Sequence, residues 1–343
     1  MKRHASQASS NDANVPKAAP PIATNDELNA ILTQYQNAEF LAIDTEFLRE
    51  RTYYPQLCLI QISDGVDAVA IDPLAPNLDL NPLWDLMRNQ NIIKVFHAGN
   101  QDMEIFLHLM GSLPAPIYDT QIAAMVCGLG DQVGYDKLVK AMLNHDIDKT
   151  SRFTDWSKRP LSNRQIVYAL DDVIYLAELY PLMRSKLEAE NRSHWLDEEY
   201  AKSNDPATYV TAPDAAWQKL KVRNMRPAPL LRLMHLAAWR EREAQSRDLP
   251  RNRVIRDETL IDLAGSNPKD RKDYANIRNF PGGKDGKLVA PISKVLDMVA
   301  AMPSSSLPEA EKRGPAKRPP AAVMELLRAV SYTHLTLPTI CSV

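Results

Sequence analysis

Two short apolar runs joined by a tight turn restrict the fold of this chain more than any other feature of its sequence. The runs are LCLIQI (57–62) and VDAVAI (66–71), and between them stands Asp64-Gly65, a dipeptide typical of two-residue β-hairpins. A third apolar run, FLAID (40–44), comes before them along the chain. We therefore expect the first three strands to form an antiparallel meander.

The pattern downstream of this meander alternates between helical and strand-like segments. A capping box of Thr24 and Glu27 also predicts a helix ahead of the first strand. After the meander we expect a helix at 80–89, a strand at 92–96, helices near 101–109, 119–127 and 134–143, and a long helix from about 162 to 190. This order predicts an α/β domain with a mixed sheet flanked by helices.

The second half of the chain has a different character. Helical periodicity dominates segments 215–221, 228–245, 257–264, 270–276 and 288–301, which predicts an all-α domain. The charge also divides, because residues 1–214 carry 18 basic and 30 acidic side chains whereas residues 215–343 carry 23 and 13. A basic second half indicates that the chain has a polyanion as a partner.

Composition sets the expected domain boundaries. The first residues are rich in Ser, Asn, Ala and Pro, which is typical of disorder, and a later Pro-rich basic stretch is typical of a linker. We expect a disordered leader at 1–22, the α/β domain at 23–200, a linker at 201–222, the helical domain at 223–302, a second linker at 303–320, and at 321–343 the truncated start of another helical domain with a foreign tail.

Several classes of protein are excluded by absent motifs. The sequence has no P-loop and no G-x-G-x-x-G fingerprint, so no nucleotide cofactor is expected. No apolar run is long enough to cross a membrane, and no apolar region of a secretory signal follows Lys2 and Arg3. The three cysteines have no paired spacing, which favours a reducing compartment, and we expect the cytoplasm.

Five residues carry the chemistry that the sequence predicts. Asp44 and Glu46 end the first apolar strand two residues apart, so both side chains project from the same face. Asp102 follows the strand at 92–96, at the start of the next helix, where it could also be a simple helix cap. Tyr168 and Asp172 are four residues apart on the long helix and share one of its faces.

These acids are informative as a set. A solvated turn explains Asp44 and Glu46 taken alone, but four carboxylates in one site cannot all ionise without compensating cations. Oxygen ligands alone select hard ions such as Mg²⁺ or Mn²⁺. Two such ions can hold the attacking and leaving oxygens of a phosphoryl displacement.

The segments around these acids resemble the three exonuclease motifs of the DEDD superfamily. They are AIDTEF (42–47), FHAGNQDMEIF (96–106) and YALDDVIYL (168–176), and the Y-x-x-x-D spacing of the third is that of the tyrosine subclass. Segments 50–63, 117–124 and 151–169 are similar to the ribonuclease D family within that superfamily. The resemblance covers residues 24–300 and implies a ribonuclease H-like fold.

The resemblance also implies a role for each motif residue. Asp44, Glu46 and Asp172 would hold one divalent metal ion, Asp44 would bridge to a second, and Asp102 would hold that second ion. Tyr168 would orient the attacking water. Contacts with the terminal nucleotide are expected from residues beside the motif acids, each of which has an equally plausible structural role: Phe47, His97, Asn100 and Gln101.

The helical half resembles the HRDC domain in segment 236–264. Arg251, Arg253 and Arg256 are expected to alternate in a short extended run, and we expect Arg251 and Arg253 to contact RNA phosphates. The alternative is a solvated basic surface.

The resemblance implies a 3′-5′ exoribonuclease that trims RNA 3′ ends, such as those of tRNA precursors, and releases nucleoside 5′-monophosphates. Two other functions stay open at this point. A DNA-directed exonuclease of the same superfamily could use the same metal chemistry, and a non-catalytic RNA-binding protein could use the basic half alone.

Overall fold

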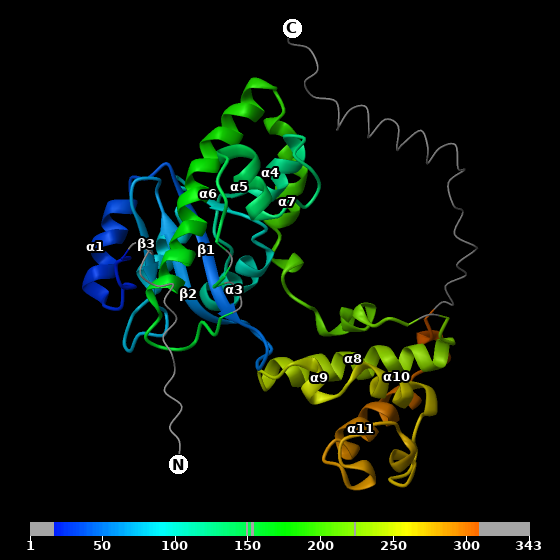
Figure 1. Cartoon of the computed structure of the whole chain (residues 1–343). Coiled ribbons are helices and arrows are strands. Elements are labelled where there is room, and N and C mark those ends of the chain that lie inside the picture. Colours follow the sequence, from blue (N-terminus) through cyan, green and yellow to red (C-terminus); the bar gives the residue numbers. More distant parts are fainter. Residues whose placement is uncertain (1–16, 149, 152–153, 223, 309–343) are drawn as a thin grey trace, which may run out of the picture. The chain divides into compact units, whose positions relative to one another are not determined.

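The computed structural model describes residues 17–308 except 149, 152–153 and 223. The chain divides into two compact units, one made of residues up to 49 together with 55–210, the other of residues 50–54 together with those from 211 onward (Figure 1). Of the expected leader, residues 1–16 lie outside the described part, as do most of the expected linker at 303–320 and all of 321–343. The last leader residues are ordered, because Ile22 forms a β-bridge with Ile71.

The first unit is built on a five-stranded mixed sheet of order β3-β2-β1-β4-β5. Its strands are β1 (Phe40–Leu48), β2 (Gln56–Ser63), β3 (Ala68–Ile71), β4 (Ile93–Phe96) and β5 (Ile117–Asp119). β1, β2 and β3 pair antiparallel, which confirms the predicted meander, and β4 and β5 extend the sheet in parallel with β1. The sequence pattern did not predict the three-residue β5.

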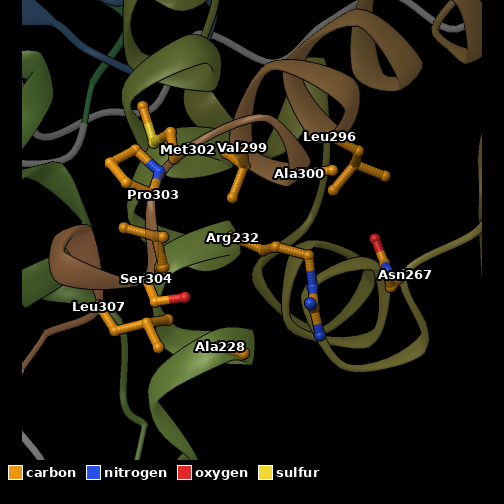
Figure 2. A pocket seen from close by; sticks show the side chains of 11 residues that line it. Ala228, Arg232, Asn267, Leu296, Val299, Ala300, Met302, Pro303, Ser304 and Leu307 are labelled. Carbon is orange, nitrogen blue, oxygen red and sulfur yellow. The ribbon is translucent and has the colours of Figure 1, made fainter.

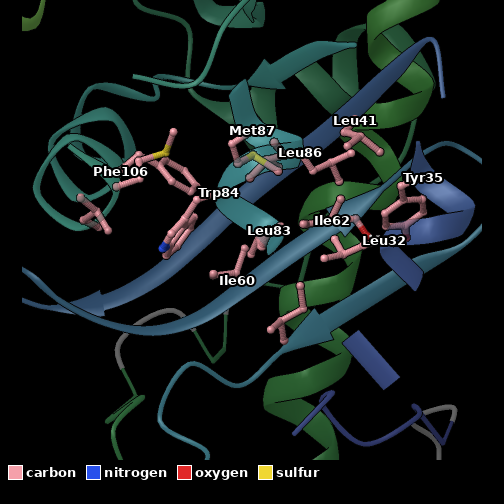
Figure 3. Close-up of a cluster of buried hydrophobic side chains, with 14 of the residues drawn as sticks. Leu32, Tyr35, Leu41, Ile60, Ile62, Leu83, Trp84, Leu86, Met87 and Phe106 are labelled. Atoms are coloured by element: carbon pink, nitrogen blue, oxygen red, sulfur yellow. Dashed lines mark hydrogen bonds between the residues drawn. The ribbon is translucent and has the colours of Figure 1, made fainter. Parts of the chain in front are cut away.

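Helices cover both faces of this sheet, as predicted. The cluster on one face joins α1 (Asn25–Tyr35), α2 (Asn81–Arg88) and α3 (Asn100–Met110) to the strands, and Figure 3 shows Leu83 and Trp84 of α2 among the strand residues Leu41, Ile60 and Ile62. The cluster on the opposite face joins α4 (Thr120–Val126), α5 (Tyr135–Leu143) and α6 (Asn163–Ala189) to Ala42 and Val95. This division follows from the alternation of strand side chains.

The long helix α6 has a defined start and a central place in the unit. Ser162 and Gln165 form a capping box at its first turn, which satisfies backbone N–H groups that would otherwise lack acceptors. The helix packs against β1, β2, β3 and β4. Near its capped end, Ala169 packs in a cluster with Cys58 and Leu59 of β2 and Ala70 of β3.

Three short helices follow α6 in the described part of the first unit, and the described part of the second unit is helical. The short helices of the first unit are η2 (Ser193–Leu196), α7 (Asp197–Ser203) and η3 (Pro206–Thr208). The helices of the second unit are η4 (Pro213–Lys219), α8 (Pro227–Ser246), α9 (Arg251–Val254), α10 (Asp257–Ser266), η5 (Asp273–Asn276), η6 (Gly283–Asp285), α11 (Val289–Ala300) and η7 (Ser304–Ser306). Leu233, Leu236 and Tyr274 are fully buried in its core.

Two expectations for this half need correction. The segment expected as a linker at 201–222 is packed, because Ala216 and Leu220 are buried in the core of the second unit. The run from Arg251 to Arg256 is not extended, because its first four residues form the helical turn α9. Among the described residues, no helix is long and apolar enough to span a membrane.

Candidate active site

Strand β1 carries two carboxylates on one face of the sheet. Asp44 and Glu46 are two residues apart and stand opposite Gln61 and Leu59 of β2. The register between the two strands then shifts between Glu46 and Phe47, so that the pairing skips Cys58 of β2. Such a bulge changes the direction of nearby side chains and is common beside active sites.

Helix α6 brings a third carboxylate to the same place. Asp44, Glu46 and Asp172 each offer an oxygen, and these oxygens lie within 4.8 Å of one another. The two strand residues and the helix residue come together because α6 packs on the face of β1 that carries them. The grouping is that of a metal site made of oxygen ligands.

Asp102 lies close to this group but is held separately. It is 7% exposed and sits in the first turn of α3, and the hydroxyl of Thr45 donates a hydrogen bond to its Oδ1. Thr45 lies between Asp44 and Glu46 in β1 and is itself buried. Strand β1 therefore positions three of the four predicted acids. It carries Asp44 and Glu46 itself, and it holds Asp102 through the hydroxyl of Thr45.

The turn that precedes Asp102 is fixed by Asp119 at the end of β5. Its carboxylate accepts hydrogen bonds from the backbone N–H groups of Ala98 (3.0 Å) and Gly99 (2.9 Å), and also caps α4 through Gln121 N–H (2.8 Å). Ala98 has a positive φ of 55°, a conformation that needs such support in a non-glycine residue. A Cβ on Gly99 would come within 2.8 Å of Phe96 Cβ, so glycine is required there.

Asp119 is not among the predicted site residues, although the sequence carries one signal for it. An Asp before a helical segment is a typical N-cap, and that is one of its two roles. Its second role, holding a turn about twenty residues earlier in the chain, depends on the pairing of β4 with the unforeseen β5.

A cavity of about 580 Å³ opens in front of these acids. Eight residues that the sequence singled out line it: Asp44, Glu46, Phe47, His97, Gln101, Asp102, Tyr168 and Asp172. Asn100 is exposed and does not belong to this lining. Within the part of the chain that the structure describes, no lysine or arginine lines the cavity.

The electrostatics of the cavity follow from this lining. Burial and the charge of Asp172 raise the pKa of the Asp44 carboxyl well above its usual range. Burial and the charge of Asp44 raise the pKa of Asp102 in the same way. Both shifts mean that negative charge is costly here unless a cation arrives. The donors are carboxylates, so the residues present fit hard divalent cations.

His97 and Tyr135 form one wall of the cavity. The His97 Nδ1 lies 3.0 Å from Thr120 Oγ1, and burial lowers the pKa of the imidazole, which favours its neutral form. Its ring centroid is 5.2 Å from that of Tyr135. The Tyr135 hydroxyl donates to the backbone carbonyl of Asp172, so this tyrosine supports a residue of the acid cluster.

Tyr135 and Gln61 are further residues of this region that were not predicted from the sequence. Tyr135 opens a helix after Gly134, and nothing in that local pattern indicates a contact with Asp172. Gln61 is fully buried opposite Asp44, and neither atom of its amide finds a hydrogen-bond partner among the described residues. A buried amide without partners is uncommon in folded proteins, so Gln61 stands out at its position opposite Asp44.

The two predicted arginines of the second unit have different surroundings. Arg251 forms a two-pronged ion pair with the buried Glu241, with both N–O distances at 2.6 Å. Arg253 is exposed on the same turn. We expected both arginines to contact RNA phosphates, but only Arg253 is exposed enough to do so.

The second unit has a smaller cavity of its own. It measures about 260 Å³, and Figure 2 shows Arg232 and Asn267 among mainly apolar side chains such as Leu296 and Val299. Arg232 is the single charged residue of its lining in the described chain. Without carboxylates it is no counterpart of the acidic cavity of the first unit.

Comparisons with known proteins agree with this geometry. A 3′-5′ exonuclease family model matches residues 20–188, and an HRDC domain model matches residues 230–296. Ribonuclease D of Zymomonas mobilis is 49% identical over 264 residues, which are 77% of this chain and 68% of that protein. Ribonuclease D of Jannaschia sp. is 44% identical over 314 residues, 90% of this chain and 81% of that protein.

Solved structures give the same result for the fold. The crystal structure of Escherichia coli RNase D, an exoribonuclease involved in structured RNA processing, matches with a TM-score of 0.81 and 33% identity. The match covers 92% of this chain and 85% of that one. The catalytic core of RRP6 from Trypanosoma brucei, at 20% identity and a TM-score of 0.63, shares the fold.

Proposed function

This chain belongs to the ribonuclease D family of 3′-5′ exoribonucleases, and from this premise we propose that it hydrolyses RNA with two divalent cations held by the acids of the first unit. The observation that carries the proposal is the group of three carboxylates within 4.8 Å of one another. The raised pKa values of Asp44 and Asp102 support it, because they mark a site where added positive charge is favourable.

Each acid has a part in this proposal. Asp44, Glu46 and Asp172 would hold one Mg²⁺ or Mn²⁺ ion, and Asp44 with Asp102 would hold the other. Such ions activate water and offset the charge that develops on a phosphodiester during hydrolysis. The protein supplies the placement of these acids through β1, α3 and α6.

The remaining residues of the cavity act on the water and the nucleotide. Tyr168 lies one turn before Asp172 on α6 and lines the cavity, so its hydroxyl can orient the attacking water. Phe47, His97 and Gln101 line the same cavity and would contact the 3′-terminal nucleotide. The product of each step is a nucleoside 5′-monophosphate, leaving an RNA one nucleotide shorter.

The second unit would bind the body of the RNA. The chain from residue 215 onward carries 23 basic against 13 acidic side chains, and Arg253 is exposed. Contacts of this kind hold phosphates without reading the base sequence. We propose 3′-extended tRNA precursors as the substrate, with the cytoplasm as the place of action.

A direct comparison of substrates tests this proposal. The protein with Mg²⁺ is expected to shorten a 3′-extended tRNA precursor much faster than single-stranded DNA of equal length, and Asp44→Ala is expected to abolish both reactions. Equal rates on the two substrates would favour the DNA-directed alternative. Unchanged hydrolysis by Asp44→Ala would remove the catalytic assignment.

A further inference from the structure

A loop just before α6 is tied to the sheet of the first unit by one arginine. Residues 154–162 lead into the helix, and Arg159 in this loop forms a two-pronged ion pair with the buried Asp72, which follows β3. The two N–O distances are 2.6 and 2.7 Å. The same guanidinium donates to the backbone carbonyl of Cys58 in β2 at 2.6 Å. Arg159 therefore holds the loop against both β2 and β3.

Arg159 also fixes the backbone of Trp156, because its Nη1 donates to the Trp156 carbonyl at 2.7 Å. The tryptophan is 2% exposed, and it packs in a cluster whose buried residues come from β2, β3 and α6: Cys58, Leu59, Ala70 and Ala169. Its indole N–H finds no acceptor among the described residues. An unpaired buried donor costs stability, and local costs of this kind are typical of residues that serve function.

Tyr168 packs its ring against this indole. The two ring centroids are 6.2 Å apart, with an angle of 33° between the ring planes, which lies in the range of attractive aromatic pairs. Tyr168 is a partly buried member of the same cluster and also lines the acidic cavity. The tyrosine therefore joins the fixed indole to the cavity.

The placement of the ring decides where the tyrosine hydroxyl lies. The hydroxyl is at the far end of the side chain, so a small rotation about the Cα–Cβ bond displaces it more than any other atom of the residue. A packed neighbour restricts such a rotation. Since a misplacement of about 1 Å can cost about 10²-fold in rate, a wall behind Tyr168 can affect the reaction without contacting the substrate.

From these contacts we infer that Trp156, held by Arg159 and Asp72, positions the Tyr168 hydroxyl and so determines how well the attacking water is oriented. The inference rests on the proposed function, because it concerns the residue that would orient this water. Trp156 and Arg159 are positioning residues, since neither of them lines the cavity. All four residues belong to the first unit.

A double-mutant cycle with Tyr168 separates this role from a merely structural one. Trp156→Leu is expected to lower kcat on a labelled single-stranded RNA by about 10- to 100-fold with little change in KM, and by no more than Tyr168→Phe does. In the Tyr168→Phe background no hydroxyl needs placing, so Trp156→Leu should change kcat by less than about twofold. A structural role would give the same loss in both backgrounds. Trp156→Phe keeps a ring against Tyr168 and is expected to recover most of the loss.

A second variant keeps the test valid if Trp156→Leu fails to fold. Arg159→Lys keeps a positive charge for Asp72 but loses the planar fork that also reaches the Trp156 carbonyl. It is expected to lower kcat in the wild-type background and to leave kcat unchanged in Tyr168→Phe. Lys158→Gln, at the adjacent position with a side chain that is 79% exposed, is the matched control and is expected to keep the wild-type kcat.

The outcomes are distinct from those of the proposed function. If folded Trp156→Leu, or Arg159→Lys in its place, matches the wild-type kcat or loses the same factor in the Tyr168→Phe background, the inference is overturned. A wild-type kcat in Tyr168→Phe alone would also overturn it. If the wild-type chain does not hydrolyse RNA in Mg²⁺ at all, the proposed function itself fails, and the inference fails with it.

Discussion

Carboxylates are buried in the acidic cavity of the first unit and in the core of the second, and their charge is compensated in different ways at these two places. In the second unit, the fully buried Glu241 meets Arg251, and the buried Arg240 meets Asp257. In the first unit, the charge of Asp172 makes ionisation of Asp44 more costly and the charge of Asp44 does the same to Asp102, and in the described chain no lysine or arginine lines their cavity. A protein cation also meets the buried Asp72 of the first unit, through Arg159, so it is the acidic cavity in particular that is left to an external cation.

The largest expected effect comes from removing an acid that has no protein cation. Asp172→Ala is expected to lower kcat by a factor on the order of 10³ or more, since under the proposed function it removes one of the three carboxylates that would hold a catalytic metal ion. The measurement is release of nucleoside monophosphate from a labelled RNA. Asp171→Ala, at the adjacent position and outside the cavity lining, is the control, and equal losses in the two variants would contradict the assignment.

The second effect is on stability rather than rate. Arg251→Ala leaves Glu241 buried without its cation, so we expect the free energy of unfolding to fall by about 3–5 kcal/mol. The exposed pair of Arg242 with Asp214 is worth about 0–1 kcal/mol, so Arg242→Ala should change little. Urea unfolding of the two variants tests the contrast, and similar losses in both would show that burial of the pair does not matter.

The third effect concerns the pH dependence of stability. Here the removal of a charge is expected to stabilise the metal-free chain, whereas Arg251→Ala destabilises it. The pKa values of Asp44 and Asp102 are raised in the folded chain, so the metal-free folded state binds more protons than the unfolded state. Its stability should therefore fall as the pH rises through the unfolded value of about 3.9 toward the higher folded values. Asp44→Asn should raise the melting temperature of the metal-free protein near neutral pH by a few degrees.

Thermal unfolding in EDTA across a range of pH measures this effect. Mg²⁺ should raise the melting temperature of the wild-type chain, because a ligand of the folded state stabilises it, and should have much less effect on Asp44→Asn. A metal-free Asp44→Asn protein that melts below the wild-type chain would show that the acids are compensated internally, as in the second unit.

The smallest effect distinguishes the two arginines of α9. Arg253→Gln should weaken binding of long single-stranded RNA and reduce the slope of log affinity against log salt by about 0.7, the value for one lost phosphate contact. Salt titrations of RNA binding measure this slope. An unchanged slope would show that Arg253 is a solvated charge without an RNA contact.

Much of the first unit could be predicted from its sequence because the signals are local. The Asp64-Gly65 turn and the alternating apolar runs indicate the meander, and the spacing of Asp44 with Glu46 and of Tyr168 with Asp172 fixes which side chains share a face. That these two faces meet follows from the packing of α6 on β1. The family motifs supplied that link in advance.

The features that escaped prediction depend on contacts between distant residues. β5 is three residues long, too short for an alternating pattern to distinguish it from the start of a helix. The roles of Asp119 and Tyr135 depend on the backbone of segments about 20 and 37 residues away. Arg251 was expected to contact RNA, but its charge is paired with Glu241, ten residues earlier, and its Nη2 donates to Tyr53, 198 residues earlier in the chain.

The number of Mn²⁺ ions bound per chain tests the central claim most directly. Electron paramagnetic resonance of Mn²⁺ titrated into the protein with a nucleoside 5′-monophosphate present counts the bound ions. We predict two ions for the wild-type chain, a loss of one for Asp102→Asn, and the loss of both for Asp44→Asn, which would bridge them. Equal Mn²⁺ binding by the wild-type chain and Asp44→Asn would contradict the claim that these acids await an external cation.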